Sequence, residues 1–337
     1  MDHIDNWNQQ RSAAQNIGGR AILLEIGARL NLLDTFLNQR EIAVADVATA
    51  SGVQQSFVAG YFAALAHAGL ALPGSKMSSE ITHYTAAPDL QKSINDVGYV
   101  LWSLVSCAPL LANAPAFARD MVSAANSHPR DGEHVARTSR WMGEQDFYPP
   151  AENAIIASRP KKIVDLGSGT CGLLIRCLRK LPEARGIGVD LSHDACAKAG
   201  AIIRAAGMEQ RISVVEASIQ SLVDNPAPIE GADVIHGGFV FHDLMPDEET
   251  TMDALFKTFR RKAPSAALVI VDAIPNAQGP GEQGFSAAFT FLHYYFMGRR
   301  FLNEDEWKAK LLAAGYSSVH VGQLGISGGR IFTARPS

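Results

Sequence analysis

The sequence has few of the features that mark secreted, membrane-spanning or nucleic-acid-binding proteins. Its four cysteines form no CxxC pair and no disulfide framework, and its first residues, MDHIDNWNQQ, lack the basic and apolar regions of a signal peptide. The 30 basic residues are balanced by 34 acidic ones and form no dense cluster, so we expect no positive field for phosphate backbones. These absences predict a cytoplasmic protein without a nucleic-acid partner.

Long apolar runs are missing as well. The most apolar stretch, residues 97–118, is interrupted by Pro109, Asn113 and Pro115, so it does not offer the roughly 20 apolar residues that cross a bilayer. We expect a pair of buried helices there and no contact with a membrane. Apolar side chains nevertheless make up 47% of the 337 residues, which is enough to fill two domain cores.

Beyond Pro160, apolar segments typical of strands alternate with amphipathic segments typical of helices up to the end of the chain. This alternation predicts an α/β fold for residues 151–337, with a doubly wound, mostly parallel sheet that helices cover on both faces. In such sheets the ligand binds beyond the carboxyl ends of the strands. The first strand ends of this region are therefore where we look for a site.

A glycine-rich turn follows the first of these strands, in the segment Lys161–Gly172, KKIVDLGSGTCG. Gly167 and Gly169 allow a ligand to approach the backbone, and the helix that follows offers its unpaired N–H groups. Asp190 ends the second strand and suits ribose hydroxyls, although GSGTCG lacks the GxGxxG spacing of dinucleotide-binding proteins. The residues predict a nucleotide-binding turn, and they leave open which nucleotide it holds.

The turn resembles the first motif of class I S-adenosylmethionine (SAM)-dependent methyltransferases. That resemblance implies SAM as cofactor, with its methionine part near Asp165 and the glycine turn and its ribose held by Asp190. Relatives usually carry an acid at the position of Ser218, so here either this hydroxyl or Glu216 would hydrogen-bond the adenine ring. The cofactor-binding residues that we expect are Asp165, Gly167, Ser168, Gly169, Asp190, Leu191, Ser218 and Gly238.

The N-terminal part reads as an amphipathic helix over residues 16–37, followed by two helices around the Ser51-Gly52 turn and a strand-like tail. This order is typical of a winged-helix domain, which we place at residues 1–95. The second of the paired helices, within residues 53–70, carries no Arg or Lys, so it is not suited to reading DNA. We expect this domain to pair two subunits in a homodimer, and residues 96–150 to form a helical linker or lid over the substrate pocket.

Three polar residues follow neighbouring strands of the predicted sheet. His242 and Asp243 come after the fourth strand, and Asp272 ends the fifth. Because the carboxyl ends of parallel strands meet at one edge of a sheet, we expect these side chains near the methyl group to be transferred. A neutral imidazole in this place can serve as a general base or as a metal ligand.

The segments FVFHDLMPDEE and VIVDAIP resemble O-methyltransferases with a winged-helix dimerisation domain, in which the catalytic histidine matches His242. Three further segments resemble the phenylpyruvate C-methyltransferases and their relatives that act on 2-oxo acids: HPRDGEHVARTSRWMGEQDFYPPA, GYVLWSLVSC and FTFLHYYFMGRRFLNEDEW.

The second resemblance implies that Arg130 binds the substrate carboxylate and that His242 and His293 hold an iron ion. The segment before MGRRFLNEDEW is shorter here than in those relatives, and His293 falls one position from their register. A two-histidine, oxygen-rich ligand set suits iron better than zinc. The substrate pocket would contain Trp102, Cys107, Phe147 and Phe239.

The sequence thus predicts methyl transfer from SAM to C3 of a 2-oxo acid, with a metal as Lewis acid for enolisation and Asp243 orienting either His242 or a metal-bound water. One alternative keeps SAM without a metal: His242, steadied by Asp272, acts as general base for O-methylation of a phenol or another hydroxyl group. A remote alternative is a non-catalytic regulator that binds SAM.

Overall fold

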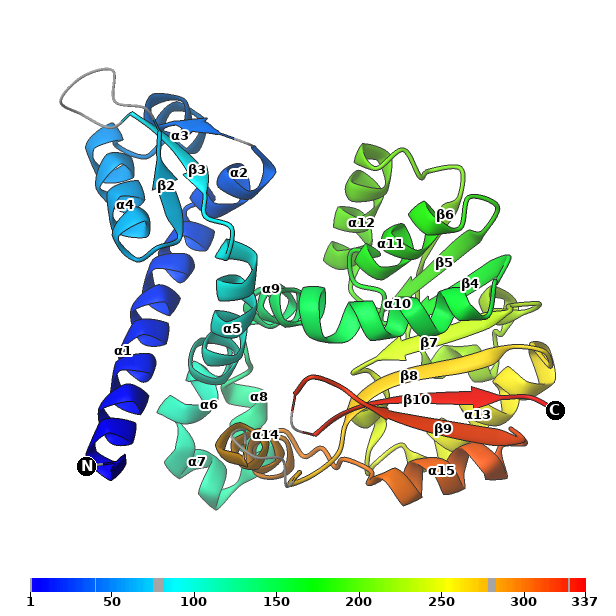
Figure 1. Ribbon diagram of the computed structural model, residues 1–337. Helices are drawn as coiled ribbons and strands as arrows, with labels where there is room; N and C mark the ends of the chain where they lie inside the picture. Colours follow the sequence, from blue (N-terminus) through cyan, green and yellow to red (C-terminus); the bar gives the residue numbers. More distant parts are fainter. Residues whose placement is uncertain (1, 40, 75–81, 278–282, 327) are drawn as a thin grey trace. The chain divides into compact units, whose positions relative to one another are not determined.

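The computed structural model describes residues 2–39, 41–74, 82–277, 283–326 and 328–337. Its contacts divide the chain into two compact units, coloured along the sequence in Figure 1. The N-terminal unit contains residues 1–112 and 130–145, and the C-terminal unit contains residues 113–129 and 146–337. Residues 96–150, which we expected as one linker or lid, are therefore shared between the two units.

The N-terminal unit is mostly helical and carries a small antiparallel sheet with the strand order β1-β3-β2. The sequence MSSEITHYTAAP, residues 77–88, predicts an irregular wing or a short hairpin; residues 77–81 of it lie outside the described residues, and residues 83–86 form a strand. The elements of this unit are α1 (Asp2–Arg29), α2 (Leu32–Asn38), β1 (Ile42–Ala43), α3 (Val44–Ser51), α4 (Gln55–His67), β2 (Ala71–Pro73), β3 (His83–Ala86), α5 (Leu90–Leu101), the π-helical turn η1 (Trp102–Ser106), α6 (Ala108–Ala112) and α9 (Gly132–Met142).

The single helix expected over residues 16–37 is two helices. Asn31 lies between α1 and α2 with a φ of 56°, in the left-handed region that ends a helix and that asparagine tolerates better than most residues. Apolar side chains continue across the break, and Leu24, Leu32 and Phe36 are all buried in the core of this unit. The apolar periodicity therefore predicted one helix, because α1 and α2 share one apolar face.

A buried group of charges ties α1 to α9. His134 is 4% exposed, and its Nε2 lies 2.7 Å from Glu25 Oε1 on α1. Arg137 lies 3.3 Å from the same carboxylate, and Arg29 approaches it from α1. His134, which the sequence left without a partner, thus belongs to an ion-pair network that fixes the packing of these two helices.

The C-terminal unit is built on a seven-stranded sheet with the order β6-β5-β4-β7-β8-β10-β9. Strands β4 to β8 pair in parallel, and β10 is antiparallel to both β8 and β9. The strands are β4 (Lys162–Leu166), β5 (Arg185–Asp190), β6 (Ile212–Glu216), β7 (Val234–Gly238), β8 (Ala267–Ala273), β9 (Ser318–Gln323) and β10 (Gly329–Arg335). The predicted α/β fold with a mostly parallel sheet is confirmed.

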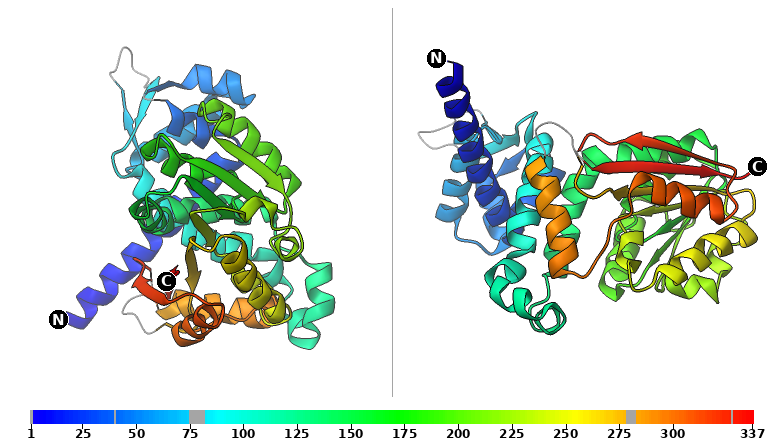
Figure 2. Two further views of the ribbon diagram at one scale, coloured as in Figure 1. Left: turned by 90° about the vertical axis from the view of Figure 1, so that its right-hand side faces the viewer. Right: turned by 90° about the horizontal axis from the view of Figure 1, so that it is seen from below.

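Helices cover both faces of this sheet (Figure 2). Helices α10, α11 and α12 pack on one face, and α13 and α15 pack on the other, where they enclose a core of fully buried rings from Phe241, Phe256, Phe259, Trp307 and Phe332. The helices of the unit are α7 (Ala114–Arg119), α8 (Met121–Ser127), α10 (Tyr148–Ala157), α11 (Gly172–Lys180), α12 (His193–Ala205), α13 (Glu249–Lys262), α14 (Gln283–Phe296) and α15 (Glu304–Ala313).

Short helical turns complete the chain: the π-helical turn η2 (Gly143–Phe147), and the 3₁₀ turns η3 (Gln220–Val223), η4 (Ala227–Ile229) and η5 (Phe241–Leu244). Among the described residues, no helix combines the length and the apolar character that a bilayer span requires.

We expect Phe256→Ala to lower the free energy of unfolding by about 3–5 kcal/mol, because it removes a buried ring from the centre of this core and leaves a cavity. Leu312→Ala is the matched control, since this side chain is 50% exposed and should change stability by less than about 0.5 kcal/mol. Urea denaturation followed by circular dichroism measures both. Equal losses in the two variants would contradict this assignment of the core.

Candidate active site

The glycine turn folds back against the second strand. Gly167 and Gly169 have φ angles of 68° and 52°, which a residue with a side chain adopts only with strain. The backbone N–H groups of Gly167 and Ser168 both donate to the carbonyl of Val189 on β5. A Cβ at Gly188 on the same strand would lie 2.6 Å from Ser168 Oγ, so glycine is required there for the turn to pack this closely.

Asp190 closes the turn through its carboxylate. Its Oδ2 accepts a hydrogen bond of 2.8 Å from the N–H of Gly169, and its Oδ1 accepts one of 2.9 Å from the N–H of Ser192. Asp190 therefore holds the turn against the end of β5 in addition to any ligand that it binds. Two donors leave further lone pairs on the carboxylate, which can accept hydrogen bonds from ribose hydroxyls.

The expected adenine side of the site is open. Leu191, next to Asp190, is 75% exposed, as suits an apolar contact for a planar ring. Ser218 uses its hydroxyl within the chain, because its Oγ accepts a hydrogen bond from the N–H of Ser221. Glu216, the alternative partner, lies 2.8 Å from His193 Nδ1, and this carboxylate raises the pKa of His193.

Asp165 and His236 form a buried pair on adjacent strands. Asp165 Oδ1 lies 2.7 Å from His236 Nδ1, and both side chains are almost fully buried. The sequence placed Asp165 near the cofactor and gave no indication of a partner for His236. The pairing follows from the register of the sheet, since β4 and β7 are parallel neighbours and these two residues occupy matching positions.

His242 and Asp272 form a second buried pair at the ends of β7 and β8. His242 Nδ1 lies 2.8 Å from Asp272 Oδ1, which also accepts a hydrogen bond from the N–H of Ala273. Asp272 is fully buried, and His242 is 6% exposed. A carboxylate at Nδ1 selects the tautomer with its proton there and its basic lone pair on Nε2.

Asp243 lies differently from the role expected for it. Its Oδ1 is 3.9 Å from His242 Nε2 and 3.5 Å from Arg299 Nε, and its side chain is 55% exposed. The residue that orients the His242 ring through a hydrogen bond is therefore Asp272, because it is tied to Nδ1 from the buried side. The turn η5 directs the Asp243 side chain outward. No pattern in the sequence indicates this orientation.

A second imidazole lies beside His242. The ring centroids of His242 and His293 are 5.4 Å apart and nearly perpendicular, so the shifted register did not prevent their approach. His293 Nδ1 lies 2.8 Å from the backbone carbonyl of Phe289, one turn earlier on α14, which again places the basic lone pair on Nε2. Phe289 and Phe301 stack with centroids 5.2 Å apart and both pack on His293.

Phe239 borders this group, with a φ of 53° in the left-handed region that a phenylalanine rarely adopts. Its ring packs on Phe147 at 4.6 Å and lies 6.4 Å from the His242 ring. Two of the four expected pocket residues, Phe147 and Phe239, are therefore in contact. Gly238, the last residue of β7, directly precedes Phe239.

The other expected substrate residues belong to the N-terminal unit. Trp102 is buried in the π-helical turn η1, a geometry that is frequent at functional sites. Cys107 is also buried, and its thiol hydrogen-bonds the guanidinium of Arg130. Burial raises the pKa of this thiol, while Arg130 opposes the rise.

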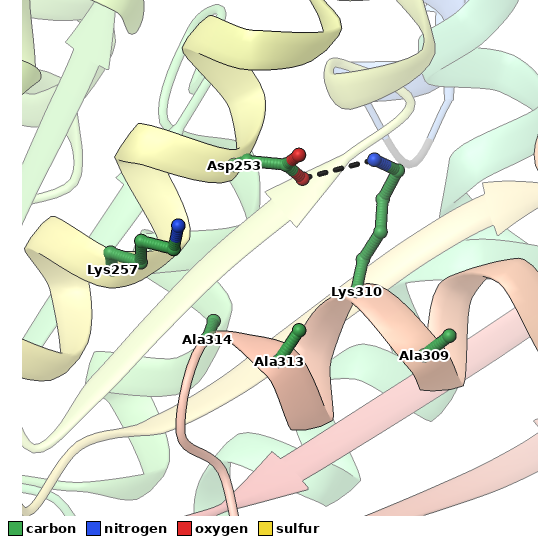
Figure 3. A pocket seen from close by; sticks show the side chains of 6 residues that line it. All are labelled: Asp253, Lys257, Ala309, Lys310, Ala313 and Ala314. Atoms are coloured by element: carbon green, nitrogen blue, oxygen red, sulfur yellow. Dashed lines mark hydrogen bonds and ion pairs between the residues drawn. The ribbon is translucent and has the colours of Figure 1, made fainter.

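A hollow of about 280 Å³ lies between α13 and α15 (Figure 3). Lys310 points across it to Asp253 and also pairs with Glu249, so its charge is already compensated. The residues that line the hollow are Asp253, Lys257, Ala309, Lys310, Ala313 and Ala314. None of them belongs to the group at the carboxyl ends of the strands.

Residues 163–262 match the family described as "Methyltransferase domain". The methyltransferase ungE' of Aspergillus campestris is 23% identical over 311 residues, 89% of this chain and 88% of that protein. The phenazine O-methyltransferase PhzM of Lysobacter antibioticus is 31% identical over 177 residues, 52% of this chain and 48% of that protein.

A solved structure, human N-acetylserotonin methyltransferase in complex with SAM, superposes with a TM-score of 0.62 over 98% of both chains at 13% identity, which establishes a shared fold. The glycine turn, Asp190 and the strand order place the C-terminal unit in the class I methyltransferase fold. With the matched domain and its methyltransferase relatives, the protein is a SAM-dependent methyltransferase.

The residues at the strand ends fit SAM. The turn with positive φ angles, the carboxylate of Asp190 and the exposed Leu191 offer a backbone cradle, a ribose acceptor and an apolar contact. For a metal, no three His, Cys, Asp or Glu side chains converge suitably in the part of the chain that the structure describes. His242 and His293 can provide two imidazole ligands, each with Nδ1 held by an oxygen in the arrangement common to metal-binding histidines.

Sequence reasoning missed two contributors to this site, His236 and Phe301. Phe301 had no detectable signal in the sequence, since it reaches His242 only after the chain turns beyond α14. Phe289, an aromatic residue that the sequence offers for a substrate pocket, lies one helical turn before His293 and packs on its ring.

We expect Asp190→Asn to weaken SAM binding by about 10- to 100-fold, the effect of losing hydrogen bonds to a charged acceptor. The variant loses an acceptor for the Gly169 N–H as well as for the ribose. Asp194→Asn, on the exposed first turn of α12, is the matched control and should bind as the wild type does. Titration calorimetry with SAM measures both, and unchanged affinity of the Asp190 variant would contradict the assigned site.

Proposed function

We propose that the protein transfers the methyl group of SAM to C3 of a 2-oxo acid, with a metal ion held by His242 and His293. The observation that supports this proposal is the second imidazole. O-methylation with a general base requires one histidine, whereas here two rings lie 5.4 Å apart with both Nδ1 atoms tied to oxygen acceptors. Oxygen acceptors at Nδ1 are common among metal-binding histidines.

The carbon next to a 2-oxo group becomes nucleophilic only after it loses a proton. SAM supplies the electrophilic methyl group, and a metal in this place would supply Lewis acidity toward the 2-oxo oxygen. Within the chain, Asp272 orients His242 and compensates positive charge in a buried position. Phe289 and Phe301 exclude water from His293, which strengthens electrostatic interactions there.

Arg130 is the proposed partner of the substrate carboxylate, and Trp102 and Cys107 are the other proposed substrate residues of the N-terminal unit. Phe147 and Phe239 are the proposed substrate residues of the C-terminal unit. Arg130 is partly buried and bonded to the Cys107 thiol, so its guanidinium is restrained before substrate arrives. A planar guanidinium pairs with a carboxylate through two parallel hydrogen bonds. Preorganisation of this kind lowers the entropy cost of aligning the two reactants.

A second candidate is O-methylation of a phenol or another hydroxyl group. The buried Asp272–His242 pair supports it, because a carboxylate at Nδ1 holds an imidazole ready to accept a proton at Nε2. A relative named as a phenazine O-methyltransferase is in keeping with this candidate. In this reading His293 only packs against the base.

We also propose that the N-terminal unit is a winged-helix dimerisation domain and that the enzyme is a homodimer. Helices α3 and α4 followed by the antiparallel pair β2 and β3 support the first part. On α1, Trp7 and Ile22 are 66% and 63% exposed, and such side chains gain from cover by a second subunit. Light scattering that finds a monomer at micromolar concentration would exclude the dimer.

We expect His293→Ala to lose the bound metal and to lower C-methylation of 2-oxo acids by at least about 100-fold, since a ligand to the Lewis acid is removed. His320→Ala, an exposed histidine on β9, should retain both properties. Metal content is measured after purification in chelator-free buffer, and turnover with labelled SAM is measured on panels of 2-oxo acids and phenols.

Two results would decide against C-methylation. One is a wild-type enzyme that methylates phenols, contains no metal and keeps its activity in His293→Ala, which would establish the O-methylation candidate. The other is SAM binding without turnover on either panel, which would favour a non-catalytic regulator.

A further inference from the structure

The proposed reaction assigns no role to His236, which is paired with Asp165. The side chains of Asp165 and His236 are 5% and 6% exposed and lie 2.7 Å apart at Oδ1 and Nδ1. Taking a carboxylate out of water is costly, and a protein retains such a group only where other contacts or a ligand compensate. The pair lies at the strand end next to the glycine turn, so a role in binding SAM has to be considered.

The position follows from the strands. Asp165, on β4, lies two residues before Gly167, and His236, on β7, lies two residues before Gly238. Gly167 and Gly238, which we expect to contact the cofactor, therefore follow the pair by two residues along each chain segment. His236 also packs against Gly238, because a Cβ added at Gly238 would lie 3.2 Å from His236 Cε1.

The negative charge of Asp165 acts in a largely apolar space. Burial raises the pKa of Cys177 on α11 to about 12, and the charges of Asp165 and Glu152 contribute to this rise. Glu152 is itself compensated by Arg176 and Lys180. The carboxylate of Asp165 has His236 as its hydrogen-bond partner across the strands.

Hydrogen bonding fixes the tautomer of His236. Nδ1 faces a carboxylate oxygen and therefore donates to it, because two acceptors would repel each other. Nε2 is buried and makes no hydrogen bond within the described part of the chain. The Nδ1–H group therefore orients the carboxylate of Asp165.

We propose that His236 is a positioning residue for SAM: it holds Asp165 so that this carboxylate attracts the α-ammonium group at the methionine end. The resemblance to SAM-dependent methyltransferases assigns a place near that end to Asp165, and the structure adds the histidine through which the carboxylate is oriented. The inference depends on SAM as cofactor and is independent of whether carbon or oxygen is methylated.

The test compares ligands with and without the methionine end. SAM and S-adenosylhomocysteine carry the α-ammonium group, whereas 5′-methylthioadenosine lacks the whole amino-acid part. We expect His236→Phe to weaken binding of the first two about tenfold, the value of one hydrogen bond to a charged group, and to leave methylthioadenosine within about twofold. Titration calorimetry measures the three affinities without turnover.

A matched pair of polar variants keeps the test valid if His236→Phe folds poorly. In His236→Asn the amide nitrogen takes the place of Nδ1 and can still donate to Asp165, whereas in His236→Gln it takes the place of Nε2. We expect Asn to bind SAM nearly as the wild type does and Gln to lose about tenfold. In an Asp165→Asn background, none of these changes should alter the ratio of SAM to methylthioadenosine affinity further.

Three outcomes would overturn the proposal. Equal losses for SAM and methylthioadenosine would show that His236 only supports the fold of the strand ends. Unchanged SAM affinity in both His236→Phe and His236→Gln would show that Asp165 needs no positioning. A full tenfold effect of His236→Gln in the Asp165→Asn background would show that the histidine acts by another route.

Discussion

The parallel pairing of β4 with β5 on one side and β7 on the other is the constraint on which this enzyme depends. It brings the glycine turn, Asp190 and Gly238 to one edge of the sheet, although they are distant in sequence. The backbone bonds from Gly167 and Ser168 to Val189, and that from Gly169 to Asp190, then lock the turn onto the second strand. The cofactor cradle is therefore made by strand pairing before any ligand contributes.

The same pairing explains why two buried histidine–carboxylate pairs occur so close to the cofactor edge. Asp165 and His236 share a register position on β4 and β7, while His242 follows β7 and Asp272 lies near the end of β8. In each pair a carboxylate holds Nδ1 and thereby sets the chemistry of Nε2. In our proposals the pair Asp165–His236 helps to bind SAM, and the pair His242–Asp272 acts on the methyl acceptor. Cofactor binding and methyl transfer thus depend on different residues of one sheet.

The sequence predicted the sheet, its crossover helices and the nucleotide-binding turn because these depend on local patterns: apolar strands, amphipathic helices and glycines at fixed spacing. It joined α1 and α2 into one helix, since a left-handed Asn31 does not interrupt the apolar periodicity. It offered both Asp243 and Asp272 as residues that could orient His242, and the structure has His242 Nδ1 hydrogen-bonded to Asp272 on the next strand.

The sequence alone therefore determined the fold class, the cofactor turn and the strand ends from which the polar residues extend. Only the tertiary structure decided which of these side chains meet: His293 approaches His242 despite its shifted position, and His236 is paired with Asp165. The reason is physical. Periodicity and turn chemistry act over a few residues, whereas a contact between strand ends or between a strand and a distant helix depends on how the whole sheet twists and packs.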